Sequence, residues 1–345
     1  MVVLLATHGA LSFMVTPVGW AIQDRSQHLG VDLAVWIVRA FALPMFFWLS
    51  GFCSRAVLEG QGVRGFVRHR VTRILLPLVI AIVPCSLALD ALWDWGRELA
   101  GRPEVAANVP KLQGSGLPIT LGHLWYLYYL LALSGIALAV VAVTRRGRLV
   151  LPGAAILASV AILACGSLAV TGMLQPDTPL GFALDPGAFA FEGALFAWGW
   201  LVHARPGELE RYGARAWWFV GIAVASLGAV LPALYDSADP ASQARPPLYA
   251  IAASGVFALA ATGAFIALCV RYARRRHRSL QLASEASYWC YIVHLPLLVL
   301  LQISLAEVRL PGVLKFLAIV AVTMVASVLS YALVIRRAPL RRLLG

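Results

Sequence analysis

Arg39 lies in the middle of a long apolar run, VDLAVWIVRAFALPMFFWLSGF. A guanidinium inside a hydrocarbon layer costs a few kcal/mol or more, so it must face protein or a water-filled interior, where it usually marks a substrate or ion path. A second cationic cluster, RHRVTR, follows this run and contains the basic pair, Arg70 and Arg73. The planar guanidinium group of arginine forms paired hydrogen bonds with phosphate oxygens, so the basic pair indicates a phosphate-bearing ligand. Binding of anionic lipid headgroups explains the same two residues at least as well.

Three histidines and a tyrosine also fall within apolar segments: His8, His123, Tyr291 and His294. A single buried histidine most often only bonds to a neighbouring helix, but three of them together with an arginine indicate a shared site. A buried histidine is suited to accept a proton from a hydroxyl group. We therefore expect these groups to line one path, along which a phosphate-bearing donor enters from inside and a hydroxyl is held nearer the outside.

Other polar and aromatic residues are secondary candidates. Trp125, in GHLWYLYYL, belongs either to an interfacial aromatic belt or to a sugar-binding platform. Asp32 precedes Arg39 by seven residues, which places both on one helix face, so we expect Asp32 to orient or neutralise the guanidinium. Asp24 is a further candidate acid, and Glu192, near an outer helix end, either joins the site or is solvated.

The elements that position these groups are membrane-spanning helices. The 345 residues are 61% hydrophobic and 13% charged, with a mean hydropathy of +0.81, which indicates an integral membrane protein. Ten segments are each long enough to cross a hydrocarbon core about 30 Å thick: roughly 2–22, 31–54, 74–95, 120–143, 149–173, 188–204, 216–235, 248–271, 286–306 and 312–335. Open strands cannot satisfy their backbone in lipid, so we predict one all-α polytopic transmembrane helix bundle over residues 1–345.

The basic residues predict the orientation, because Lys and Arg collect in short cytoplasmic loops. With both termini cytoplasmic, 20 of the 28 Lys and Arg lie inside, seven lie outside, and Arg39 is within a span. The net charge of +12 is spread over five membrane edges, which favours contact with lipid headgroups and argues against nucleic acid. The five cysteines show no CxxC spacing, so we expect free thiols and no metal.

Four segments carry a family resemblance: THGALSFMVTP, VRAFALPMFFWLSGF with RHRVTRILLP, GHLWYLYYLLAL, and ASYWCYIVHLPLLVL. In their order and spacing they resemble the acyltransferase 3 family of membrane acyltransferases, in particular its periplasmic glucan succinyltransferase branch. The resemblance implies a multi-pass protein of about ten helices in the bacterial inner membrane. It also implies transfer of an acyl group, acetyl or succinyl, from cytoplasmic acyl-CoA to a hydroxyl of an extracytoplasmic glycan or related acceptor.

The resemblance assigns roles to individual residues. His8 matches the family's catalytic histidine, Arg39 a polar site residue of the second helix, and the basic pair the donor-side motif; the positions matched to substrate binding are His123, Trp125, Tyr291 and His294. The family also carries an arginine eleven residues before the histidine. That position would precede Met1, so either the first helix is truncated at its N-terminus or the family's site is incomplete.

The leading hypothesis is O-acyl transfer. In it His8 is the general base on the acceptor hydroxyl, Arg39 stabilises the oxyanion, and the basic pair binds the phosphates of the donor. No covalent intermediate is required, although Ser50 and Cys53 keep that option open. Two alternatives come from other classes: a carrier for a small anion or an acylated sugar with Arg39 as the binding charge, and a non-catalytic membrane scaffold.

Overall fold

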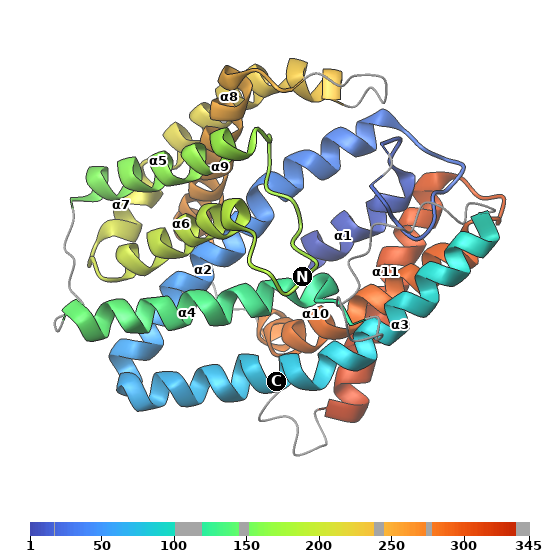
Figure 1. Cartoon of the computed structure of the whole chain (residues 1–345), viewed down its shortest axis with the longest axis horizontal. Coiled ribbons are helices and arrows are strands. Elements are labelled where there is room, and N and C mark those ends of the chain that lie inside the picture. Colours follow the sequence, from blue (N-terminus) through green and yellow to red (C-terminus); the bar gives the residue numbers. More distant parts are fainter. Residues whose placement is uncertain (17, 101–118, 145–151, 238–244, 274–277, 336–345) are drawn as a thin grey trace.

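The computed structural model describes residues 1–16, 18–100, 119–144, 152–237, 245–273 and 278–335, and within these ranges the chain is helical with connecting turns and loops. The helices are α1 (Val2–Ala10), α2 (Leu29–Arg70), α3 (Leu76–Ala100), α4 (Trp125–Thr144), α5 (Gly153–Thr171), α6 (Pro186–His203), α7 (Glu208–Ala214), α8 (Ala216–Ser237), α9 (Leu248–Tyr272), α10 (Arg278–Leu305) and α11 (Gly312–Ser330). The predicted all-α helix bundle is confirmed (Figure 1).

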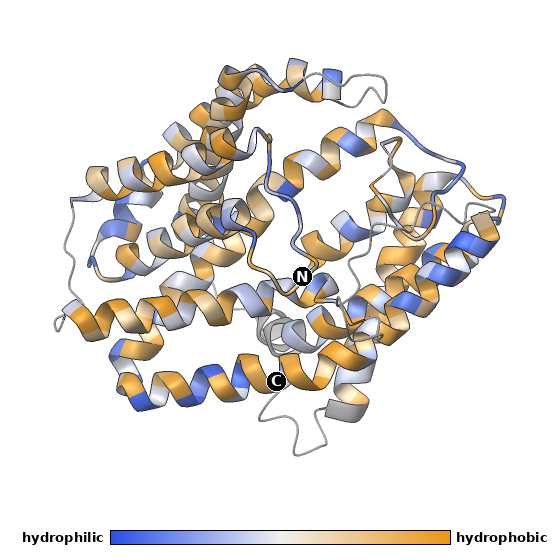
Figure 2. Cartoon of the chain, in the orientation of Figure 1, coloured by the Kyte–Doolittle hydropathy of each residue, from blue (hydrophilic) through white to orange (hydrophobic). Residues whose placement is uncertain are grey.

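The surface of the bundle is that of a multi-pass membrane protein. Within the described residues, seven helical stretches are long and apolar enough to cross a membrane, and the first of them, Leu29–Ala100, contains two of the predicted segments. Figure 2 shows apolar residues along the lengths of the helices and hydrophilic residues mostly near their ends. Large apolar side chains point outward, and Val170 is 90% exposed. Such apolar surface is rare on a soluble monomer and suits contact with lipid tails.

The predicted first span, 2–22, is wrong. The helix α1 ends at Ala10 and is followed by a 3-10 turn at Leu11–Phe13. The chain then turns back, because the backbone amide of Asp24 donates to the Ser12 carbonyl and that of His28 to the Phe13 carbonyl. The apolar character that suggested a longer helix belongs to a loop whose Ala21 and Ile22 are only 5% exposed because they pack against other helices.

Asp32 holds this loop in place. Its carboxylate oxygens accept hydrogen bonds from the backbone amides of Val15 (2.9 Å) and Thr16 (2.8 Å). The predicted pairing of Asp32 with Arg39 is therefore wrong: the carboxylate satisfies amide donors of the loop, which would otherwise be left unpaired in a partly buried place.

A buried ion pair ties the same loop to α11. The ammonium of Lys315 lies 2.6 Å from the carboxylate of Asp24, and the two side chains are 3% and 5% exposed. Removing one member of such a pair leaves an uncompensated charge, so we expect Asp24→Ala to lower the free energy of unfolding by about 3–5 kcal/mol. Thermal unfolding of the detergent-solubilised protein measures this loss. A double variant, Asp24→Leu with Lys315→Met, is expected to regain most of it, and equal instability of both variants would contradict the prediction.

The long helix α2 crosses the bundle and separates two groups of helices, with α5–α9 on one side and α1, α3, α10 and α11 on the other (Figure 1). The backbones of α2 and α6 touch: a Cβ on Gly199 would overlap the carbonyl of Trp48, and one on Gly51 would overlap that of Phe196. Small residues allow this close packing of helices in a membrane. A second glycine feature bends α2, because Gly62 has a positive φ of 66°.

Beyond this bend the helix continues through a π turn at Val71–Leu75 into α3. Arg70 ends α2, and Arg73 lies within the π turn. The basic pair is therefore held by helical backbone at the start of α3.

Candidate active site

Three histidines from separate elements meet where α1, α10 and the turn before α4 come together. His8 Nδ1 lies 3.0 Å from His294 Nε2, and these two rings are stacked with centroids 5.2 Å apart. The ring of His123 meets that of His294 edge-on, also at 5.2 Å. His294 is fully buried and His123 is 7% exposed, whereas His8 is partly exposed. The structure thus brings together three candidates that lie up to 286 residues apart in the sequence.

The hydrogen bonds fix which nitrogen of each ring carries a proton. His294 Nδ1 lies 2.7 Å from the carbonyl oxygen of Tyr291. A carbonyl can only accept, so in the neutral ring Nδ1 is protonated and Nε2 holds the lone pair. That lone pair must accept the hydrogen bond from His8, which makes His8 Nδ1 the donor. His8 Nε2 is consequently the unprotonated nitrogen and is able to take up a proton.

Pro296 explains why α10 can bind His123. A proline in a helix has no N–H to give to the carbonyl four residues earlier, which here is that of Ile292. This carbonyl accepts a hydrogen bond from His123 Nε2 at 2.9 Å, and the Tyr291 hydroxyl donates to the backbone carbonyl of His123. By the same reasoning His123 Nδ1 holds a lone pair, and it is buried with no hydrogen-bond partner among the described residues.

Two residues that the sequence analysis missed support His8. The Gln302 amide donates to the His8 carbonyl (3.1 Å) and to Ser12 Oγ (3.1 Å), while its oxygen accepts from Trp20 Nε1 (2.8 Å). The ring of Trp20 stacks on that of His8 at 6.0 Å. Gln302 had a signal in the sequence, as a lone amide in the apolar run LLVLLQISL. Trp20 had none, because only the fold of the loop brings it to His8.

A series of side-chain contacts, hydrogen bonds with one aromatic contact among them, leads from the histidines to Arg70, and we call it the polar line. The rings of Tyr291 and Tyr126 are 6.1 Å apart, and the Tyr126 hydroxyl lies 2.5 Å from Ser50 Oγ. Ser54 Oγ donates to the carbonyl of Ser50 and accepts from Arg70 Nη2 at 2.7 Å. Side chains of α2, α4 and α10 thus connect Arg70 with the histidines through the interior of the bundle.

The two members of the basic pair are half-buried. The guanidinium of Arg70 lies over the ring of Phe66 at 4.7 Å, and its Nε is buried without a hydrogen-bond partner among the described residues. In contrast, Arg64 and Arg68 on the same segment are exposed. Burial of an arginine beside polar hydroxyls is more than contact with lipid headgroups requires, and it leaves donors directed at the interior.

Arg39 is held by the connection between α5 and α6. Its Nη2 donates to the carbonyl of Pro176 (3.0 Å) and to the Thr178 hydroxyl (2.9 Å). The guanidinium therefore faces protein, as expected for a cation at this depth.

Glu192 lies in a small cavity beside Arg39 that Gln175 and Ser254 also line. It is 3% exposed, and its Oε2 has no hydrogen-bond partner among the described residues. The alternative that Glu192 is solvated is therefore wrong, and it belongs to the interior on the Arg39 side of the bundle.

Trp125 is a residue of the hydrophobic core. It is 6% exposed and packs between Phe47 (ring centroids 5.8 Å apart) and Tyr129 (5.2 Å) in the main core. Neither an interfacial belt nor a sugar platform fits this environment, because both need an open face of the indole.

The five cysteines are free thiols, as the absence of CxxC spacing predicted.

Comparisons with known proteins agree with this picture. A family model described as an acyltransferase domain matches residues 1–332. This match runs from Met1 through α11 and includes the three histidines, Arg39 and the basic pair. No curated protein and no solved structure matches the chain.

Proposed function

The chain belongs to the acyltransferase 3 family and is an acyl-transferring membrane enzyme, and on this premise we propose that it moves an acyl group from cytoplasmic acyl-CoA to a hydroxyl of an extracytoplasmic glycan or related acceptor. The proposed location is the bacterial inner membrane. The donor carries an acetyl or succinyl group.

In the proposed reaction His8 Nε2 is the general base. It accepts the proton of the acceptor hydroxyl while the oxygen attacks the thioester carbonyl. The tetrahedral intermediate then collapses and breaks the carbon–sulfur bond, and the proton passes from His8 to the leaving CoA thiolate. The products are an acyl ester and free CoA, and no covalent enzyme intermediate is required. The observation that carries this proposal is the hydrogen bond from His8 to His294, since it leaves Nε2 unprotonated.

Two positive groups complete the proposed site. Arg39 stabilises the oxyanion of the tetrahedral intermediate, where a fixed positive charge lowers the barrier most. The basic pair binds the phosphates of CoA at the other end of the polar line. This assignment is supported by the half-buried Arg70 and its bond to Ser54.

The test is acyl transfer in proteoliposomes that hold the purified full chain. Acetyl-CoA and succinyl-CoA are offered on one face and neutral oligosaccharides on the other. We expect release of CoA thiol together with an acylated sugar, detected by a thiol reagent and by mass spectrometry. Passage of an unchanged sugar or anion without any release of CoA would instead identify a carrier and overturn the proposal.

We expect loss of the basic pair to weaken donor binding. Arg70→Ala or Arg73→Ala removes hydrogen bonds to a charged phosphate, each worth about 1.5–3 kcal/mol. The KM for acyl-CoA should therefore rise about tenfold or more. Arg64→Ala and Arg68→Ala are matched controls, because these arginines are exposed on the same segment. An equal rise in the KM for acyl-CoA in the controls would show that donor binding depends on the overall positive charge of this segment and not on the basic pair.

A further inference from the structure

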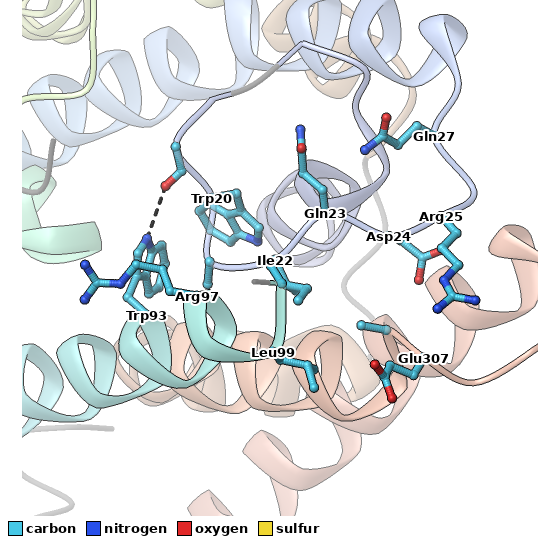
Figure 3. A pocket seen from close by; sticks show the side chains of 14 residues that line it. Trp20, Ile22, Gln23, Asp24, Arg25, Gln27, Trp93, Arg97, Leu99 and Glu307 are labelled. Atoms are coloured by element: carbon cyan, nitrogen blue, oxygen red, sulfur yellow. Dashed lines mark hydrogen bonds between the residues drawn. The ribbon is translucent and has the colours of Figure 1, made fainter. Parts of the chain in front are cut away.

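A second cavity lies beyond the histidines, between the loop at residues 19–27, the last turns of α3 and the start of the α10–α11 connection. Its volume is about 450 Å³, within the range of small-molecule sites. We name it the tryptophan pocket after Trp20 and Trp93, which lie side by side at one end of it, while Arg25, Asp24 and Glu307 lie at the other (Figure 3).

The pocket and the basic pair lie at opposite ends of one helix. Arg73 lies in the π turn that leads into α3, whereas Trp93 and Arg97 lie in the last turns of α3. The 25 residues of α3 span about 37 Å at about 1.5 Å per residue. This length exceeds a hydrocarbon core of about 30 Å. A ligand of the tryptophan pocket therefore arrives from the membrane face opposite the one at which the basic pair lies.

Hydrogen bonds hold both indoles in place. Trp93 Nε1 donates to the Gly19 carbonyl at 3.1 Å, and Trp20 Nε1 donates to Gln302. The two rings meet edge-on, with centroids 5.2 Å apart and planes at 72°. Because both N–H groups are occupied and the ring of Trp20 already stacks on His8, Trp93 offers its apolar ring surface to a ligand, and its rigidity limits the entropy lost on binding.

The charges around the pocket balance. Two arginines, Arg25 and Arg97, face two acids, Asp24 and Glu307. Asp24 is paired with Lys315, and Arg97 is paired with Asp94. An anionic ligand would need an excess of positive charge here. Apolar ring faces beside amides and balanced charges suit an uncharged molecule that has both C–H faces and hydroxyl groups.

We propose that the tryptophan pocket binds the acceptor as a neutral carbohydrate, with Trp93 as the platform on which a sugar ring stacks. This inference rests on the proposed function, whose acceptor hydroxyl it assigns to a sugar. Trp20 connects the pocket to the chemistry, since it lines the pocket and stacks on the ring of His8. A sugar ring stacked on Trp93 is separated from the general base by the single indole of Trp20, which contacts both Trp93 and His8.

The test compares Trp93→Ala, Trp93→Phe and the control Trp95→Ala. Trp95 lies on the same helix, is 42% exposed and is not part of the pocket lining. Binding is measured by calorimetry on the purified full chain without acyl-CoA, with maltohexaose, cellohexaose and chitohexaose as neutral probes and dextran sulfate as the anionic probe. Thermal unfolding in detergent confirms that each variant is folded.

We expect at least one neutral probe to bind, Trp93→Ala to weaken that binding about tenfold or more, and Trp93→Phe and Trp95→Ala to retain most of it. In transfer assays Trp93→Ala should raise the KM for the sugar and leave the KM for acyl-CoA unchanged. The proposal is overturned if no neutral probe binds, if dextran sulfate binds more tightly, or if Trp93→Ala binds like the wild type.

The two proposals fail in different ways. If the protein binds sugar through Trp93 but never releases CoA, the sugar-binding role of the tryptophan pocket is supported and the transfer reaction is contradicted. Acyl transfer that requires His8 but not Trp93 would support the proposed reaction and contradict sugar binding in the tryptophan pocket.

Discussion

Replacing His8 with alanine is expected to lower the kcat of acyl transfer by about 10²–10⁴-fold, the usual contribution of a general base. The Nε2 lone pair is lost and no other group takes its place at that position. The measurement is release of CoA thiol from acyl-CoA at saturating donor and acceptor. The KM for acyl-CoA should change little, because the basic pair lies at the other end of the polar line.

His8→Asn separates loss of the base from loss of structure. The asparagine amide can still donate to His294 Nε2, as His8 Nδ1 does, but it offers no basic nitrogen. We expect this variant to be as inactive as His8→Ala and to unfold at nearly the wild-type temperature. His203→Ala is the matched histidine control, since His203 is at the end of α6 beside Glu59. Equal transfer rates in His8→Asn and the wild type would remove His8 from the mechanism.

Replacing His294 should impair the enzyme in a graded way. In His294→Phe the imidazole of His8 loses the acceptor that fixes its tautomer. We expect kcat to fall about 10–100-fold, by analogy with the loss of the hydrogen-bonded partner of a metal-binding imidazole. In His294→Gln the side-chain oxygen can still accept from His8 Nδ1, so much of the activity should return. The rates of the two variants are compared at matched expression and folding.

A purely structural His294 predicts a different result. In that case the loss of activity would follow the loss in unfolding temperature, and glutamine would rescue only as far as it restores stability. A phenylalanine variant that unfolds like the wild type and turns over at the wild-type rate would show that His294 does not position the base. His294 is fully buried, so both variants require the unfolding measurement.

The candidate site residues were visible in the sequence because a membrane makes polar residues conspicuous. Arg39, His8, His123 and His294 stand in runs where lipid favours apolar side chains, so their presence needed a reason other than solvation. The helical class followed from the same physics, since an unpaired backbone is too costly in hydrocarbon. Helix ends were harder to predict: the apolar loop after Phe13 has the composition of a span but is buried by protein instead of lipid.

The sequence alone thus determined the helical class, the membrane setting and most of the polar residues that the fold gathers. Only the tertiary structure decided their partners: Asp32 caps a loop instead of pairing with Arg39, Trp125 fills the core, and Trp20 and Gln302 support His8. The physical reason is that hydropathy depends on each residue and its near neighbours, which the sequence contains. A hydrogen bond such as that between His8 and His294 depends on where elements 286 residues apart are packed against each other.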